Sequence, residues 1–137
     1  MKIFLLSALI ISSLLSSNVK KLEAQILSSI AHSLVHKKNV NICIDDKNFK
    51  GIEKYEKNLK LVSCGKADIV FTSKDSDIDK KCKTSLIFST SYYLYEHSPV
   101  IVGAFFWQKG RPNIIFREKQ LKSLGINLPK DFKKYIE

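Results

Sequence analysis

Two histidines at helical spacing could bind a metal ion. His32 and His36 lie four residues apart in a segment with helical apolar periodicity, so one helix would present both imidazoles to one metal ion. The established helical zinc motifs add a glutamate and a third ligand, and neither accompanies this pair. We keep His32 and His36 as weak metal candidates and expect two solvated side chains, with no metal and no cofactor.

Residues suited to covalent or acid–base catalysis are scattered. The sequence contains no Gly-x-Ser-x-Gly elbow, and its five glycines are dispersed rather than gathered in a phosphate-binding loop. Asp75, Asp77 and Asp79 begin like a calcium loop but lack the glycine and the closing glutamate of that motif. We therefore do not expect an enzyme.

Polar and aromatic side chains follow the apolar runs that we interpret as strands. Ser73 and Lys74 follow one run, and Ser89, Thr90 and then Tyr92 follow the next along the chain. Ligands of open α/β sheets bind beyond the carboxyl ends of parallel strands, so these five residues are candidates for holding a small polar ligand. The alternative is that the hydroxyl groups only cap the helix that follows.

Three cysteines, Cys43, Cys64 and Cys82, allow one disulfide and one remaining thiol. Cys64 and Cys82 each stand just before an apolar run, and adjacent parallel strands would bring them together. We therefore favour a Cys64–Cys82 disulfide, with Cys43–Cys64 as the alternative. Cys43 lies inside an apolar run, where a buried free thiol is common.

The N-terminus has the parts of a secretory signal peptide. Lys2 supplies the positive charge, residues 3–15 are apolar apart from small serines, and Leu22-Glu23-Ala24 is a candidate processing site ahead of Gln25. The apolar run is shorter than the ~20 residues that a spanning helix needs. We expect a cleavable signal peptide over residues 1–24 and a single periplasmic α/β domain over residues 25–137. If the signal stays uncleaved, the domain would be tethered to the inner membrane.

The net charge of +10 does not by itself indicate a nucleic-acid partner. The lysines occur singly or in pairs, and no basic stripe is visible in the sequence. Exported proteins seldom meet nucleic acid. We expect none as a partner.

The sequence predicts that helices alternate with short strands and that these elements position the candidate residues named above. Periodicity and turn residues predict helices over residues 25–36, 49–57, 91–97 and 117–124, with a last one after Pro129. They predict strands over residues 40–44, 59–62, 67–72, 85–88, 100–107 and 113–116, the last two forming a hairpin around a Gly/Pro turn. The fold class is α/β: a small sandwich with a mixed, mostly parallel sheet and a late antiparallel hairpin.

The order of elements resembles the YfiR-like periplasmic proteins. The resemblance is carried by the strand at 41–44, by 62–64 leading into 67–71, by 85–88, and by the closing Phe116, Leu121, Gly125-Ile126 and Leu128. That family consists of small α/β domains that repress membrane-bound diguanylate cyclases by binding their periplasmic sensor portions. The resemblance implies a non-enzymatic regulatory or sensor protein that acts by protein–protein contact.

The implied partner is a membrane-bound signalling protein, either a diguanylate cyclase or a sensor kinase, and a homo-oligomer is a further possibility. Within the hairpin, Trp107 and Arg111 are the expected anchors, because aromatic residues and arginine dominate interface energetics. The alternative for Trp107 is packing into the core from one face of the hairpin. The alternative for the whole chain is a small-ligand module of the periplasmic solute-binding type.

Overall fold

The computed structural model describes residues 2–75 and 86–137, with side chains described from residue 18 onward. Its centre is a six-stranded sheet in the order β2-β1-β3-β4-β5-β6, in which only β5 and β6 pair antiparallel. The strands are β1 (Val40–Asp45), β2 (Leu59–Leu61), β3 (Ile69–Thr72), β4 (Leu86–Ser89), β5 (Gly103–Gln108) and β6 (Arg111–Phe116). The expected α/β class, with a mostly parallel sheet and a late hairpin, is confirmed.

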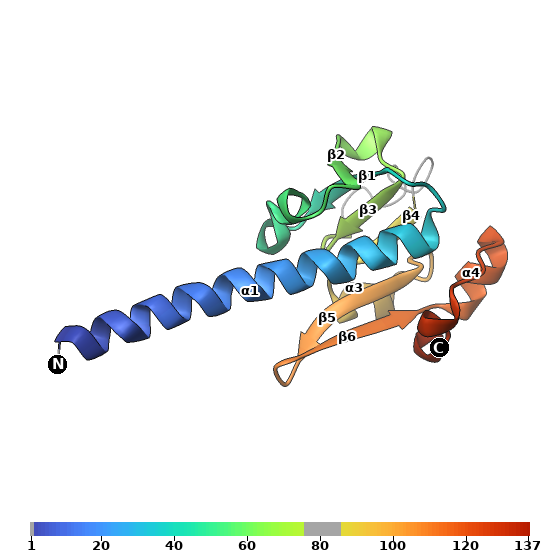
Figure 1. The fold of residues 1–137 in the computed structure, drawn as a ribbon. Coiled ribbons are helices and arrows are strands. Elements are labelled where there is room, and N and C mark those ends of the chain that lie inside the picture. The colour runs from blue at the N-terminus through green and yellow to red at the C-terminus, as the bar shows by residue number, and fades with distance from the viewer. Residues whose placement is uncertain (1, 76–85) are drawn as a thin grey trace.

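Helices cover both faces of this sheet (Figure 1). The long helix α1 (Lys2–Leu34) packs across one face, and its amino-terminal part projects beyond the sheet. The short helix α3 (Tyr92–His97) covers the other face, and α4 (Glu118–Leu124) follows the last strand. In the part of the chain that the structure describes, no helix is both long and apolar enough to cross a membrane.

The larger core lies between the sheet and α1. Side chains alternate along a strand, so Ile69 and Phe71 of β3 face α1 while Val70 faces α3. Both faces are covered, which explains why β3 is a continuous apolar run rather than an alternating one. In the middle of this core, the ring of Phe88 lies 5.7 Å from that of Phe71 and 5.9 Å from that of Phe116, measured between centroids.

Arg117, for which the sequence indicated no role, closes the smaller core under α3. The Arg117 guanidinium lies 4.1 Å from the ring centroid of Tyr95, and Arg117 Nε donates to the Ile101 carbonyl at 3.0 Å. Burial raises the pKa of the Tyr95 hydroxyl against the opposing effect of the Arg117 charge. Arg117 thus fixes α3 and the chain entering β5 to the end of β6.

A two-residue turn, Lys109-Gly110, connects β5 to β6. Lys109 and Gly110 both have positive φ, 53° and 73°, as a type I′ turn requires. At the other end of β5, Gly103 permits close packing, because a Cβ there would overlap the Ile115 carbonyl oxygen. The ladder pairs Gly103 with Phe116 at one end and Gln108 with Arg111 at the other. The result is a long two-stranded ribbon at the edge of the sheet.

Three expected helices have different bounds or types. The segment expected over residues 49–57 forms two short 3₁₀ helices, η1 (Lys47–Phe49) and η2 (Ile52–Tyr55), because Gly51 between them adopts φ +88°. The helix expected after Pro129 is the 3₁₀ helix η4 (Lys130–Tyr135). The helix expected over residues 25–36 is part of α1, which starts before Gln25 and ends at Leu34.

Candidate functional site

A polar cavity lies beyond the carboxyl ends of β1 and β3. The chain leaves β1 toward β2 on one side and returns to β3 on the other side of β1, so these two strand ends flank the point where the winding reverses. The cavity has a volume of about 450 Å³. Its lining consists of Ile44, Asp45, Asp46, Lys47, Asn48, Lys50, Ser73 and Lys74.

Hydrogen bonds tie the strand ends around this cavity to one another. Asp46 is 8% exposed, and its carboxylate accepts from Thr90 Oγ1 at 2.7 Å and from the Asn48 backbone N–H at 2.9 Å. Asp45 accepts from Thr72 Oγ1 at 3.3 Å, and the Lys74 ammonium lies 3.8 Å from its carboxylate. Buried carboxylates are stabilised when such donors replace water. The cavity wall is therefore held by contacts among β1, β3 and β4.

The structure gathers only part of the expected ligand set at this cavity. Ser73 and Lys74 line it, and Thr90 reaches it through Asp46. Ser89 is fully buried, and its hydroxyl donates to the Ser91 carbonyl and accepts from the Ser91 N–H. Tyr92 lines a different groove, with its ring centroid 5.0 Å from that of Phe106. Ser89 thus serves the turn into α3, whereas the cap of α3 is Ser91, whose hydroxyl accepts from the Leu94 N–H.

We expect Asp46→Ala to lower the free energy of unfolding by about 2 kcal/mol, because Thr90 Oγ1 and the Asn48 N–H both lose a charged acceptor. Urea unfolding of the full chain measures this. The exposed Asp131 provides the control, since Asp131→Ala should change stability by less than about 0.5 kcal/mol. Equal stability of the Asp46→Ala variant and the parent chain would contradict the described network.

The two expected partner anchors, both in the hairpin, differ in their contacts with the rest of the domain. Trp107 is 38% exposed, its Nε1–H donates to Glu23 Oε2 of α1 at 3.0 Å, and its ring packs edge-on against Phe105. Arg111 is exposed beside the turn and shares a shallow hollow with Gln108, Lys109 and Asn113. Trp107 is thus partly committed to intramolecular packing, and Arg111 is presented to solvent.

A second groove, of about 460 Å³, runs beside β6. Aromatic side chains from three elements line it: Tyr92 from α3, Phe106 from β5 and Tyr135 from η4. The pKa of Tyr92 is raised, mainly by a hydrogen bond between its hydroxyl and Glu96. Tyr92 is 42% exposed. Gln108 and Asn113 line both this groove and the hollow at Arg111, so the two features are adjacent. We call them together the hairpin groove.

The disulfide joins Cys43 to Cys64, so the favoured Cys64–Cys82 pairing is wrong and the alternative is correct. Cys43 lies on the α3 side of β1, and the short helix η3 (Cys64–Lys66) passes over that side between β2 and β3. The Val62 N–H donates to the Ile42 carbonyl at 2.9 Å, which fixes this approach. Cys82 lies outside the described residues.

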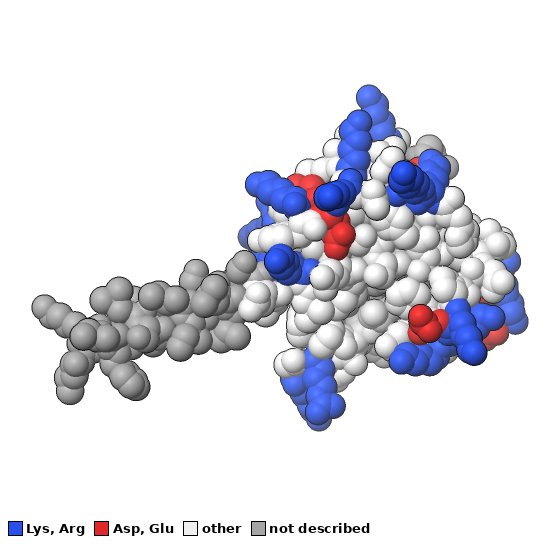
Figure 2. Space-filling model, viewed as in Figure 1, with Lys and Arg blue, Asp and Glu red and all other residues white. Residues whose placement is uncertain are grey.

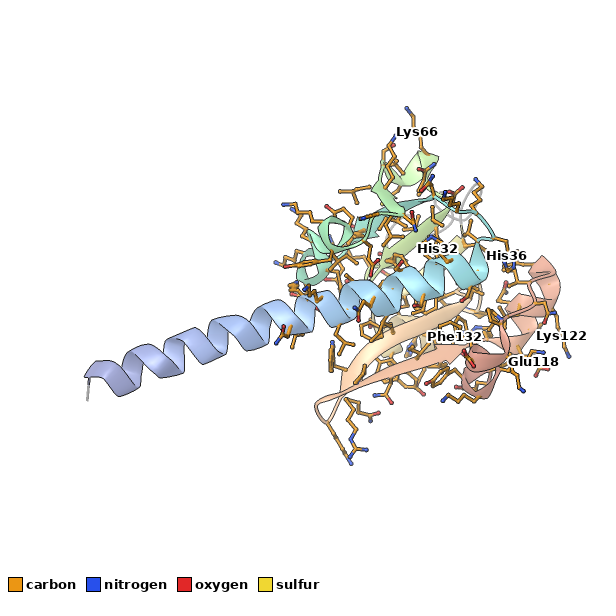
Figure 3. All side chains as sticks on the ribbon, in the orientation of Figure 1. His32, His36, Lys66, Glu118, Lys122 and Phe132 are labelled. Atoms are coloured by element: carbon orange, nitrogen blue, oxygen red, sulfur yellow. A yellow bond between two sulfur atoms is a disulfide. The ribbon has the colours of Figure 1, made fainter. Side chains whose placement is uncertain are left out.

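The histidine pair does not share a helix face. Helix α1 ends at Leu34, so His36 belongs to the turn that follows it (Figure 3). His32 lies with Nδ1 2.8 Å from the Ser28 carbonyl oxygen and Nε2 3.1 Å from the Lys38 carbonyl oxygen. Among the residues with described positions, no three His, Cys, Asp or Glu side chains cluster as a metal site.

No protein-family model and no curated protein sequence matches the chain. The fold is similar to the crystal structure of a conserved domain protein from Vibrio cholerae O1 biovar El Tor str. N16961, with a TM-score of 0.57 and 8% sequence identity. The match covers 82% of this chain and 58% of the Vibrio chain, so the chain spans little more than half the length of that protein. At this identity the likeness concerns the fold alone.

Proposed function

We propose that the chain is an exported, non-enzymatic regulatory protein that binds the periplasmic portion of a membrane-bound signalling protein. The diguanylate cyclases bound by the YfiR-like family, which the sequence resembles, are the model for this partner, and a sensor kinase is the second possibility. The Cys43–Cys64 disulfide supports export, because disulfides persist in oxidising compartments. The hairpin groove is the observation that carries the proposal.

The composition of the hairpin groove supports a protein partner. Interfaces typically combine an aromatic centre with a polar, charged rim. Here Tyr92, Phe106 and Tyr135 form the centre, while Lys134, Glu137 and Arg111 lie at the rim. Lys109 also lines the hollow, so three cations lie beside one glutamate, which favours a partner whose matching surface carries acidic side chains.

Capture from solubilised membranes, with the full chain as bait, tests this proposal. The bait should retain a membrane protein that has an exported segment and a cytoplasmic output domain. Arg111→Glu places a like charge against the acidic partner surface and should weaken capture at least tenfold. Arg111 is exposed, so the substitution leaves the core intact.

Lys66→Glu is the matched control, since it makes the same change in charge at an exposed position far from the hairpin (Figure 3). It should capture the partner as well as the parent chain does. Equal capture by the Arg111→Glu bait and the parent bait would contradict a role for the hairpin groove.

The cavity at the ends of β1 and β3 supports the second candidate, a small-ligand module. Lys74 and Ser73 face a space of about 450 Å³ beside two carboxylates, which suits a small zwitterionic or polar molecule. Screening amino acids and other polar metabolites by thermal shift tests it. A ligand that raises the melting temperature of the parent chain but not of a Lys74→Ala variant would favour this function over the first.

A further inference from the structure

The junction between the expected signal segment and the domain is packed into the fold. Helix α1 continues without interruption through the candidate processing bond between Ala24 and Gln25. Ala24 is fully buried in the larger core, together with Leu27 and Ile30 of the same helix. The apolar stripe that covers the sheet therefore begins before Gln25.

Glu23 has a specific partner in the hairpin. Glu23 is 7% exposed, and its carboxylate accepts the hydrogen bond of Trp107 Nε1 at 3.0 Å. Removal of Glu23 would leave the indole N–H of Trp107 without this acceptor. A charge-assisted bond at so low an exposure is among the stronger contacts that a side chain can make.

Lys20, one helical turn before Glu23, also contacts the domain. Its ammonium donates to the Asn48 carbonyl in the connection after β1, beside the cavity described above. The contacts of Lys20, Glu23 and Ala24 thus reach two separate parts of the domain. In Figure 1 the helix leaves the domain beside the hairpin, at the end of the sheet where β5 ends.

We propose that the mature protein begins no later than Lys20, and that the bond between Ala24 and Gln25 is not the processing site. The segment Lys20–Ala24 is then the first part of the folded domain rather than the last part of the signal. Ser16 and Ser17, a few residues upstream of Lys20, supply small residues of the type that signal peptidases accept immediately before the cleaved bond. This inference rests on the export that the proposed function assumes, but not on any partner.

The intact mass and the N-terminal peptide of the exported protein, isolated from cells, test the proposal. We expect a chain that still contains Lys20–Ala24. A chain that starts at Gln25 would overturn the proposal. Because no partner is involved, this result is independent of the capture experiment above.

A substitution at Leu22 sharpens the test. Leu22 would occupy the third position before the bond if Ala24–Gln25 were cut, and a lysine there would block cleavage. Its side chain is 40% exposed, so Leu22→Lys leaves the core intact. We expect the same N-terminus in the variant and the parent chain. Accumulation of an unprocessed Leu22→Lys form would overturn the proposal.

Stability of the exported protein gives a second readout. Glu23→Ala should lower the melting temperature by roughly 5 °C and shift the emission of Trp107, the single tryptophan of the chain. The exposed Glu118 is the control, because Glu118→Ala removes only the surface pair with Lys122 and should leave both quantities nearly unchanged. A Glu23→Ala protein with the parent's melting temperature and emission would show that Glu23 is absent from the mature fold, and would overturn the proposal.

Discussion

Replacement of Phe88 by alanine is expected to lower the free energy of unfolding by about 3–5 kcal/mol. Phe88 is fully buried in β4, between the rings of Phe71 and Phe116. Its ring also fills the space that Gly103 leaves, since a Cβ at Gly103 would lie 2.7 Å from the Phe88 ring. The cavity left by an alanine would therefore border three strands, which leaves little scope for collapse. Urea unfolding at unchanged m-value measures the loss.

Tyr93 provides the matched control for Phe88. It is an aromatic residue of similar size on α3, but its side chain is 71% exposed. Tyr93→Ala should change the free energy of unfolding by less than about 0.5 kcal/mol. A loss below about 1 kcal/mol for Phe88→Ala would mean that the described packing between α1 and the sheet is wrong.

Loss of the Cys43–Cys64 disulfide is expected to lower the free energy of unfolding by about 3 kcal/mol. The crosslink closes a loop with a sequence separation of 21, which spans β2, η1 and η2. It restricts the unfolded chain, and it fixes η3 against β1 in the folded one. The Cys64→Ser variant and dithiothreitol treatment of the parent chain should give similar losses in urea unfolding.

Cys82→Ser separates this pairing from the one favoured by the sequence. If Cys43 and Cys64 are bonded, Cys82→Ser keeps the disulfide, retains the parent chain's sensitivity to dithiothreitol and leaves one thiol fewer to titrate. Loss of dithiothreitol sensitivity in Cys82→Ser would instead show that Cys82 takes part in the bond.

The fold class was predictable because the strands are short apolar runs bounded by turn residues. Five of the elements show this directly: β1, β2, β3, β4 and the hairpin all lie within two or three residues of the expected positions. The left-handed Gly125 at the end of α4 and the Ser91 cap of α3 also follow from local chemistry, which neighbouring residues alone determine.

The errors in the fold had two causes, one local and one set by distant parts of the chain. Gly51 breaks the segment after β1 into two 3₁₀ helices, although its apolar spacing is compatible with one α-helix. The disulfide depends on which face of β1 the connection to β3 crosses, and that face is set by the winding of the whole sheet. Gly51 was a local signal that the apolar spacing outweighed, whereas no local pattern determines the disulfide pairing.

The position of the cavity could be expected from the sequence, but the set of side chains that line it could not. Ser73 and Lys74, which were selected because ligands bind beyond parallel strand ends, line one cavity, and a ligand there stays a prediction. It did not reveal that Tyr92 points to another groove, or that Glu23, inside the expected signal segment, holds Trp107. Both facts have one cause: a side chain's direction depends on contacts that cross the sheet.

The most direct test of the proposed function is photo-cross-linking in living cells from a reactive amino acid at position 111. Arg111 is exposed beside the turn of the hairpin, and Lys66 is exposed on η3, away from the hairpin (Figure 3). Figure 2 shows lysine and arginine side chains both at the tip of the hairpin and at the opposite end of this face, near β2. We predict a cross-link from position 111, and none from position 66, to a membrane protein with an exported segment and a cytoplasmic output domain. The same products from both positions, or none from either, would contradict regulation through the hairpin groove.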